Sequence, residues 1–206
     1  MNPEGPFLFD TSAESWLSRD PAGRQWLLQY SRRHLVYVSA ITVLERLTGF
    51  GIALAQATSE RAGWIRSMRD SYDQTPARVL PVHHAVVRAA AELICLVPDA
   101  PSPPVSARRR AESKAGRIAR WRFDIVIAAT SLVQGLPLVH NNSRDFEVLR
   151  EALARHPERF PGLGAMRLLR CIELQGIVLR PPGREVAFGC RRGHVASGRA
   201  LRAGAQ

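Results

Sequence analysis

Short apolar runs alternate with longer amphipathic segments over the first three quarters of the chain. Residues 7–9, 34–38, 77–82 and 136–140 are rich in leucine, β-branched and aromatic residues, which is typical of short buried strands. One or two helical segments separate each run from the next, and strands joined through helices pair in parallel. This pattern predicts an α/β fold in which a central parallel sheet of about four or five strands is flanked by helices.

The segments between these runs carry apolar residues at helical spacing. Ser12 and Ser39 stand at positions suited to N-caps of two of these segments, and Gly135 is suited to end a third. Asp124 is expected at or near the start of a buried helix. The expected helices cover residues 13–19, 22–33, 40–57, 59–75, 83–97, 125–134 and 143–156, and helical character also resumes near Glu112, before the helix of residues 125–134.

The last quarter of the chain differs from the rest. Residues 162–179 predict either one helix or a helix and a strand, and beyond Arg180 the Gly, Arg, Pro and Ala residues show no periodicity. We therefore expect one folded domain over residues 1–157 and a basic C-terminal extension, partly disordered, over residues 158–206.

The composition is that of a globular protein. The chain has 206 residues, of which 46% are hydrophobic, enough for the core of one domain. It contains no run of about 18 apolar residues, so we expect no membrane span, and its N-terminus lacks the features of a secretory signal. Cys95, Cys171 and Cys190 are far apart and form no C-x-x-C pair. Free thiols of this kind favour a reducing, cytoplasmic location.

The net charge of +11 is unevenly distributed. Residues 1–157 hold 20 basic and 15 acidic side chains, whereas residues 158–206 hold 9 and 3, so over half of the excess lies in the last quarter. A basic surplus is consistent with a nucleic-acid partner, although an arginine-rich tail alone is weak evidence. The Arg108–Arg110 run fits either a solvated loop or a phosphate contact.

Carboxylates recur where the predicted strands meet helices. Asp10 follows the first strand, and Glu45 follows the second within the next helix. The carboxyl ends of parallel strands meet at one edge of a sheet, where ligands bind in such folds. Carboxylates gathered there can hold Mg²⁺ over a phosphodiester and orient an attacking water. The pattern therefore suggests a nuclease.

Three stretches resemble, in sequence and order, a PIN-domain ribonuclease of the VapC toxin type: FLFDTS, SAITVLERLTGF and FDIVIAATSLVQGLPLVHNNSRDFE. The resemblance covers roughly residues 6–150 and is strongest over residues 123–147. It implies a PIN-like fold and an endoribonuclease that depends on Mg²⁺, with Mn²⁺ as a substitute. It also implies a homodimer and inhibition by a cognate antitoxin.

The resemblance assigns roles to individual residues. Asp10, Glu45 and Asp124 match the first three catalytic acids, and Asp10 and Asp124 are the expected metal ligands. For the fourth acid, the place after the last strand holds Asn142, and Asp145 follows three residues later. Asp145 is therefore expected to supply the remaining carboxylate.

Other side chains are expected to support the site. Thr11 and Ser12 match the polar residues that follow the first acid, and Arg144 or Arg122 is expected to contact the RNA backbone. His140 stands where threonine is usual and is a local departure from the family pattern.

Simpler interpretations remain for single residues. Asp10 could merely cap a helix, Glu45 could be a solvated helix residue, and Asp124 or Asp145 could be favoured by the helix dipole. Asn142 could simply be a turn residue.

Other enzyme classes fit less well. A haloacid-dehalogenase-type phosphatase needs a second Asp where this chain has Ser12. The chain has neither a phosphate-binding G-x-x-x-x-G-K-[ST] loop nor a G-x-S-x-G nucleophile elbow. The alternative from another class is a catalytically weak PIN module that binds RNA or a protein partner. Asn142 and the Pro/Arg-rich insertion at residues 98–110 keep that alternative open.

Overall fold

The computed structural model describes residues 5–74, 77–101 and 113–174. The predictions for the Arg108–Arg110 run, for Cys190 and for the chain beyond Arg180 lie outside the described residues. No helix in the described ranges is both long and apolar enough to cross a bilayer.

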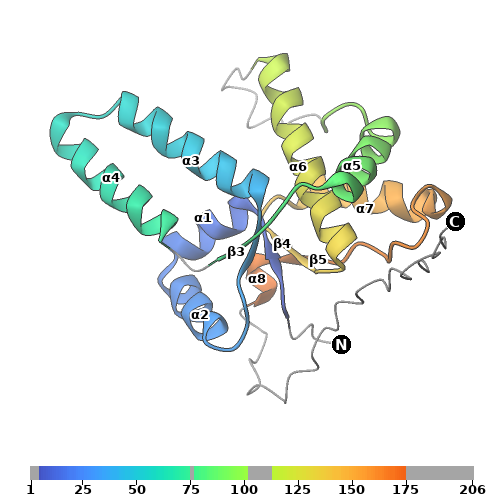
Figure 1. The fold of residues 1–206 in the computed structure, drawn as a ribbon, viewed down its shortest axis with the longest axis horizontal. Coiled ribbons are helices and arrows are strands. Elements are labelled where there is room, and N and C mark those ends of the chain that lie inside the picture. Colours follow the sequence, from blue (N-terminus) through green and yellow to red (C-terminus); the bar gives the residue numbers. More distant parts are fainter. Residues whose placement is uncertain (1–4, 75–76, 102–112, 175–206) are drawn as a thin grey trace, which may run out of the picture.

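The sheet has five strands, all parallel, in the order β3-β2-β1-β4-β5 (Figure 1). The α/β fold with a central parallel sheet is therefore confirmed. The strands are β1 (Leu8–Phe9), β2 (Tyr37–Ser39), β3 (Arg78–Leu80), β4 (Leu138–His140) and β5 (Leu168–Arg170). The helices are α1 (Thr11–Arg19), α2 (Pro21–Ser31), α3 (Ala40–Ala55), α4 (Ser59–Asp73), α5 (His84–Leu96), α6 (Lys114–Gln134), α7 (Ser143–Arg155) and α8 (Cys171–Leu174).

The sheet does not end at the expected boundary of residue 157. A 3-10 turn at Pro157–Arg159 leads to β5, which pairs with β4, and Phe160 and Met166 are buried in the main core. Residues 158–174 therefore belong to the same packed domain. Up to residue 174, the last one described, the segment predicted over residues 162–179 contains a strand followed by a short helix, β5 then α8.

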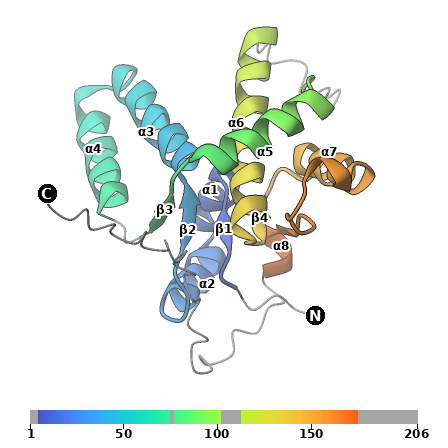
Figure 2. The ribbon, with the colours of Figure 1, turned by 45° about the vertical axis from the view of Figure 1, so that its right-hand side comes forward.

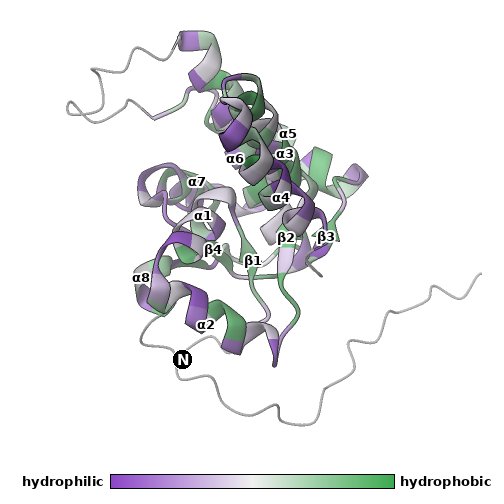
Figure 3. Ribbon diagram, turned by 90° about the vertical axis from the view of Figure 1, so that its left-hand side faces the viewer, coloured by the Kyte–Doolittle hydropathy of each residue, from purple (hydrophilic) through white to green (hydrophobic). Residues whose placement is uncertain are grey.

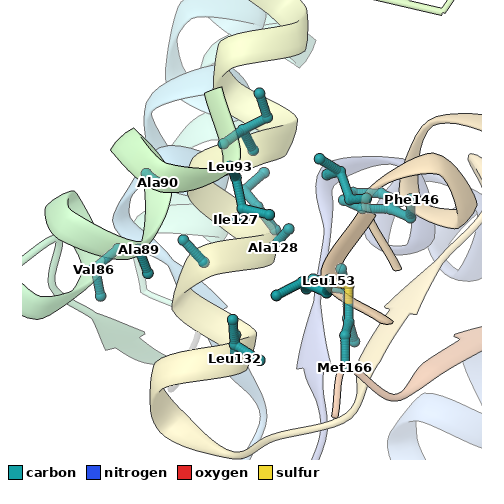
Figure 4. Packing of buried hydrophobic residues seen from close by; sticks show 14 of the residues in the cluster. Val86, Ala89, Ala90, Leu93, Ile127, Ala128, Leu132, Phe146, Leu153 and Met166 are labelled. Atoms are coloured by element: carbon teal, nitrogen blue, oxygen red, sulfur yellow. The ribbon is translucent and has the colours of Figure 1, made fainter. Parts of the chain in front are cut away.

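Alternating side chains of the strands face two separate layers of helices. Leu8 and Leu138 pack in a cluster with α5, α6 and α7, whereas Phe9 and Val139 pack with α1, α2 and α8. Figure 4 shows apolar side chains of α5, such as Leu93, against those of α6. The two central strands β1 and β4 are covered on both faces and fully buried, which explains why they are mainly apolar. In the ribbon coloured by hydropathy, the helices carry both hydrophilic and hydrophobic segments (Figure 3).

Two parts of the molecule project from this core. The α3–α4 hairpin extends away from the sheet, and the N-terminal half of α6 rises beyond it on the other side (Figures 1 and 2). The helix α6 begins at Lys114, where Ser113 accepts a hydrogen bond from Gly116 N at 3.1 Å, and it ends at Gly135 with φ of 66°. Gly135 thus ends the helix in the left-handed conformation that glycine adopts without strain.

This long helix corrects the expected position of Asp124. The residue lies in the middle of α6 and not near its start. The segment before it continues the helix because residues 117–123 contain no proline or glycine to stop it. The helix dipole at an N-terminus therefore cannot explain the acid.

Candidate active site

The strand order reverses direction at β1, because β2 and β3 lie on one side of it and β4 and β5 on the other. A crevice is expected at such a switch point, beyond the carboxyl ends of the strands. The structure has a cavity of about 650 Å³ there. All four predicted acids line it: Asp10, Glu45, Asp124 and Asp145.

Asp10 is buried at the end of β1, with 3% of its surface exposed, and it is also the N-cap of α1. Its carboxylate accepts hydrogen bonds from Ala13 N at 2.6 Å and from Ser12 Oγ at 2.7 Å. The expectation that Ser12 caps this helix is wrong, because the helix already begins at Thr11, so Ser12 lies inside its first turn and Asp10 holds the cap position. Capping and lining the cavity are therefore compatible roles of one residue.

The hydrogen bonds to the Asp10 carboxylate nevertheless do not offset the cost of burying its negative charge. Burial raises its pKa to about 6, although the hydrogen bonds from Ala13 and Ser12 oppose this rise. The negative charge of Glu45 contributes to the same rise. The site thus contains a buried acid that a cation would stabilise in its charged form.

Ser12 connects the two strands of the switch point. Its hydroxyl donates to Asp10 and accepts a hydrogen bond from Asn141 N at 2.9 Å. The backbone N–H of Asp10 donates to Val139 O at 3.1 Å. These bonds hold the segment after β1 against the segment after β4, so the two halves of the cavity keep a constant spacing.

Glu45 reaches the cavity from α3. The helix begins after Ser39, whose side chain accepts from Ile41 N at 3.3 Å, which confirms the predicted cap. The Glu45 carboxylate is half-buried and accepts a hydrogen bond from the Thr11 hydroxyl. Glu45 is therefore not a freely solvated helix residue, and Thr11 holds it towards the end of β1.

Asp124 lies at the centre of the electrostatic interactions. Its pKa is raised to about 8, first by burial and then by the negative charges of Asp145, Asp10 and Glu45, while the charge of Arg120 opposes the rise. Charges act on one another in this way when they are close together and partly shielded from water. The four acids, which come from four separate segments of the chain, therefore share one electrostatic environment.

Asn142 lies between two of these acids. Its side-chain amide donates to Asp145 Oδ2 at 2.7 Å and approaches Asp124 Oδ2 at 3.5 Å. Asn142 precedes α7 but makes no side-chain cap hydrogen bond with it. The amide is thus directed into the acidic cavity and not towards the helix that follows it. Asn142 therefore does more than form a turn.

The oxygen atoms that line the cavity fit a hard divalent cation as ligands, because Mg²⁺ prefers carboxylate and amide oxygens together with water. The raised pKa values of Asp10 and Asp124 indicate negative charge that lacks a counter-ion. Across the described ranges, however, no three His, Cys, Asp or Glu side chains are already arranged to hold a metal ion. The fit therefore lies in the chemistry of the oxygens, and binding would require small side-chain movements.

Arginines line the cavity beside the acids. Arg144, at the start of α7, is among them, as the sequence predicted. Arg122 is exposed and does not line the cavity, so the structure does not bring it to the site. Arg117 and Arg120 do line it and were missed. The sequence signal for them was their spacing of seven and four residues before Asp124. This spacing puts the three side chains on one helix face only if α6 extends back to Arg117.

A second polar cluster borders the cavity and was also missed. Arg46 donates from Nη1 to Ser15 Oγ at 3.1 Å, and Ser15 lines the cavity. The Arg46 guanidinium lies 5.4 Å from the ring centroids of both Phe50 and Tyr72, and its Nε is 3.9 Å from Glu14 Oε2. Burial raises the pKa of Glu14 to about 7 even though Arg46 opposes the rise. This cluster joins α1, α3 and α4 next to the acids.

His140, the departure from the family pattern, is fully buried at the end of β4. Its ring packs on Phe146, with centroids 5.1 Å apart, and neither ring nitrogen makes a well-formed hydrogen bond. Burial lowers its pKa to about 4, although the charge of Glu173 acts in the opposite direction. His140 is thus a neutral core residue beneath the cavity and does not line it.

Comparison with known proteins identifies the fold. No family model and no curated protein matches the sequence. Among solved structures, one similar chain is from the VapBC2 complex of Rickettsia felis bound to a promoter DNA fragment, with 11% identity, 80% of this chain and 97% of that chain covered, and a TM-score of 0.50. Another is from FitAB bound to the IR36 DNA fragment, with 17% identity, coverage of 81% and 95%, and a TM-score of 0.50.

The site and these likenesses define a class of fold. The fold is similar to that of the chains matched in the VapBC2 and FitAB complexes, which agrees with the PIN-like α/β fold that the sequence resemblance implied. At identities of 11% and 17% the likeness extends to the fold alone.

Proposed function

We propose that the protein is a metal-dependent endoribonuclease and the toxin of a toxin–antitoxin pair. The observation that carries this proposal is the convergence of Asp10, Glu45, Asp124 and Asp145 on one cavity at the switch point of the sheet. Four acids in one cavity destabilise each other unless a cation binds there. Mg²⁺, with Mn²⁺ as a substitute, is the cation that this oxygen set suits.

In this proposal Asp10 and Asp124, the two buried acids, hold the cation. Glu45, oriented by Thr11, and Asp145, oriented by Asn142, complete the set of oxygens. When bound, the cation lowers the pKa of a coordinated water and stabilises charge on the phosphate. Water then adds to phosphorus as the bond to the 3′-oxygen breaks, which leaves a 5′-phosphate and a 3′-hydroxyl. No side-chain nucleophile is needed.

The toxin assignment follows from the named neighbours, which are complexes of the VapBC and FitAB type. A cognate antitoxin can silence this site by placing an arginine or lysine among the acids in place of the metal. We also propose a homodimer, by the same family resemblance.

A direct test compares the wild type with Asp10→Asn and Asp124→Asn on labelled single-stranded RNA, with Mg²⁺ or with EDTA. Each variant keeps the shape of the side chain but removes its charge, so cleavage should fall at least about 100-fold, and EDTA should abolish it in the wild type. Asp70→Asn, on the exposed face of α4, is the matched control and should cleave normally.

The second candidate is a PIN module that binds RNA or a partner without cutting it. It is favoured by the lack, within the described residues, of a preassembled group of three metal-binding side chains, and by the Asn142 amide that already contacts two acids. RNA binding that is unchanged by Asp10→Asn and Asp124→Asn, with no cleavage in Mg²⁺ or Mn²⁺, would establish this alternative.

A further inference from the structure

We propose that Arg117 and Arg120 form a phosphate-binding subsite on α6, which holds the RNA strand next to the bond that is cut. The proposal deepens the proposed nuclease function and rests on it. It concerns a part of the cavity wall that carries positive charge and lies beside the four acids.

The geometry of α6 places this subsite. Arg120 and Arg117 precede Asp124 by four and seven residues, so the three side chains share one face of the helix. With a rise of 1.5 Å per residue, Arg120 is about 6 Å and Arg117 about 10 Å along the axis from Asp124. This half of α6 projects beyond the sheet (Figure 2), so the two arginines extend the cavity away from the acids.

The wall between the acids and the arginines is fixed. Trp121 is 2% exposed, and its Nε1 donates to Val97 O at 3.0 Å. Ala100 and Pro101 line the same wall. The buried ring ties α6 to the segment after α5, so the helix face that carries the arginines keeps a constant position relative to the acids.

The charge pattern indicates the ligand. The acids would bind a cation at the phosphate that reacts, but each neighbouring phosphate of the strand carries its own charge. Guanidinium groups bind phosphate oxygens in a forked geometry and do not require a particular base. Arg120 lies close enough to Asp124 to lower its pKa, whereas Arg117 is farther out. A strand that crosses the acids would therefore meet Arg120 first and Arg117 next.

The test uses the full-length protein and three single variants on one helix: Arg117→Gln, Arg120→Gln and Arg122→Gln. Arg122 is exposed on α6 but does not line the cavity, so it is the matched control for the loss of one charge. Binding of a fluorescent single-stranded RNA is measured in EDTA over a range of NaCl concentrations. Cleavage of the same RNA in Mg²⁺ gives kcat and KM, and thermal melting reports folding.

We expect Arg117→Gln and Arg120→Gln each to weaken RNA binding about three- to tenfold. Each should also reduce the slope of log affinity against log salt by about 0.7, the contribution of one phosphate contact to a single strand. KM should rise with kcat nearly unchanged, and Arg122→Gln should resemble the wild type. Arg117→Lys should restore the salt slope but only part of the affinity, because lysine lacks the fork.

Salt slopes and KM values that are the same in all three glutamine variants would overturn the proposal of a phosphate-binding subsite. The proposed nuclease function would not be affected by that result. If the wild type binds RNA with these effects but never cleaves it, the subsite stands and the nuclease function fails. Equal binding of polyglutamate, with the same losses in Arg117→Gln and Arg120→Gln, would overturn the assignment to RNA.

Discussion

The Asn142 amide donates to the Asp145 carboxylate at 2.7 Å, and the same nitrogen is 3.5 Å from a carboxylate oxygen of Asp124. The sequence posed these as alternatives, since either Asn142 or Asp145 could occupy the fourth position. In the structure both line the cavity, and the neutral amide is a hydrogen-bond donor between two acids. Part of the stabilisation that a cation would provide is therefore already supplied by the chain.

Asn142→Ala removes this donor. We expect the metal-free protein to lose about 1 kcal/mol of stability, because two carboxylates would then lose their shared hydrogen-bond partner. Added Mg²⁺ should stabilise the variant more than it stabilises the wild type. Thermal melting with and without Mg²⁺ measures both effects. Asn141→Ala is the control, since only its backbone N–H is bonded to Ser12, and an equal loss in that variant would contradict the role of the Asn142 amide.

The pKa of Asp124, raised to about 8, predicts how stability changes between pH 6.5 and 8. The unfolded chain releases this proton near its ordinary pKa of 3.8, so in this window the folded state binds more protons than the unfolded state. Stability without metal should therefore fall as pH rises. Glu14, with a pKa of about 7, acts in the same direction.

Urea unfolding in EDTA at pH 6.5 and pH 8 measures this fall. Asp124→Asn should remove most of it, because the amide does not titrate, and Mg²⁺ should reduce it in the wild type. A wild type that is equally stable at both pH values would show that Asp124 is ionised at neutral pH without help from a cation.

His140 predicts the opposite dependence at lower pH. Its folded pKa of about 4 lies below the ordinary value of 6.5, so between these values the unfolded state binds more protons. The stability that the neutral ring provides is present above pH 6.5 and is lost as pH falls towards 4. His140→Leu keeps an apolar contact with Phe146 and should lose less stability than the wild type over that range. If the free energy of unfolding falls equally in the two proteins between pH 6.5 and pH 4.5, this account is contradicted.

Arg46 and Glu14 form a partly buried charge pair, with 21% and 16% of the side chains exposed. Arg46→Met keeps an apolar stem between Phe50 and Tyr72 but leaves the Glu14 carboxylate without its cation. We expect a loss of about 1–3 kcal/mol, less than for a fully buried pair because solvent screens part of the interaction.

A double-mutant cycle with Glu14→Gln tests this coupling. The double variant should recover part of the stability lost in Arg46→Met, since no buried charge would remain unpaired. If the two losses simply add, the pair does not interact, and the effect of Arg46 comes from its aromatic contacts and its hydrogen bond to Ser15.

Periodicity and local chemistry were sufficient for several parts of this protein. The apolar runs predicted the first four strands, and Ser39 and Gly135 were predicted as helix boundaries, because each depends on residues only a few positions apart. Asp10 and Glu45 were placed at one edge because parallel strands share the direction of their carboxyl ends. Asp124 and Asp145 were added to them by the resemblance to the VapC type. That all four line one cavity agrees with this reasoning, while their catalytic roles stay predictions.

Two local features were predicted wrongly: Asp10 rather than Ser12 caps α1, and Asp124 lies in mid-helix. Other features depended on contacts between distant segments, such as the pairing of β5 with β4 beyond residue 157. Arg117 and Arg120 belong to the cavity only because α6 packs as one long helix against α5.

The sequence by itself determined which segments are strands or helices and which chemistry they carry, since hydrophobic period and capping are local properties of the chain. Only the tertiary structure decided which side chains meet in the cavity, because that depends on which helix faces the sheet buries and on how far each helix extends past its edge.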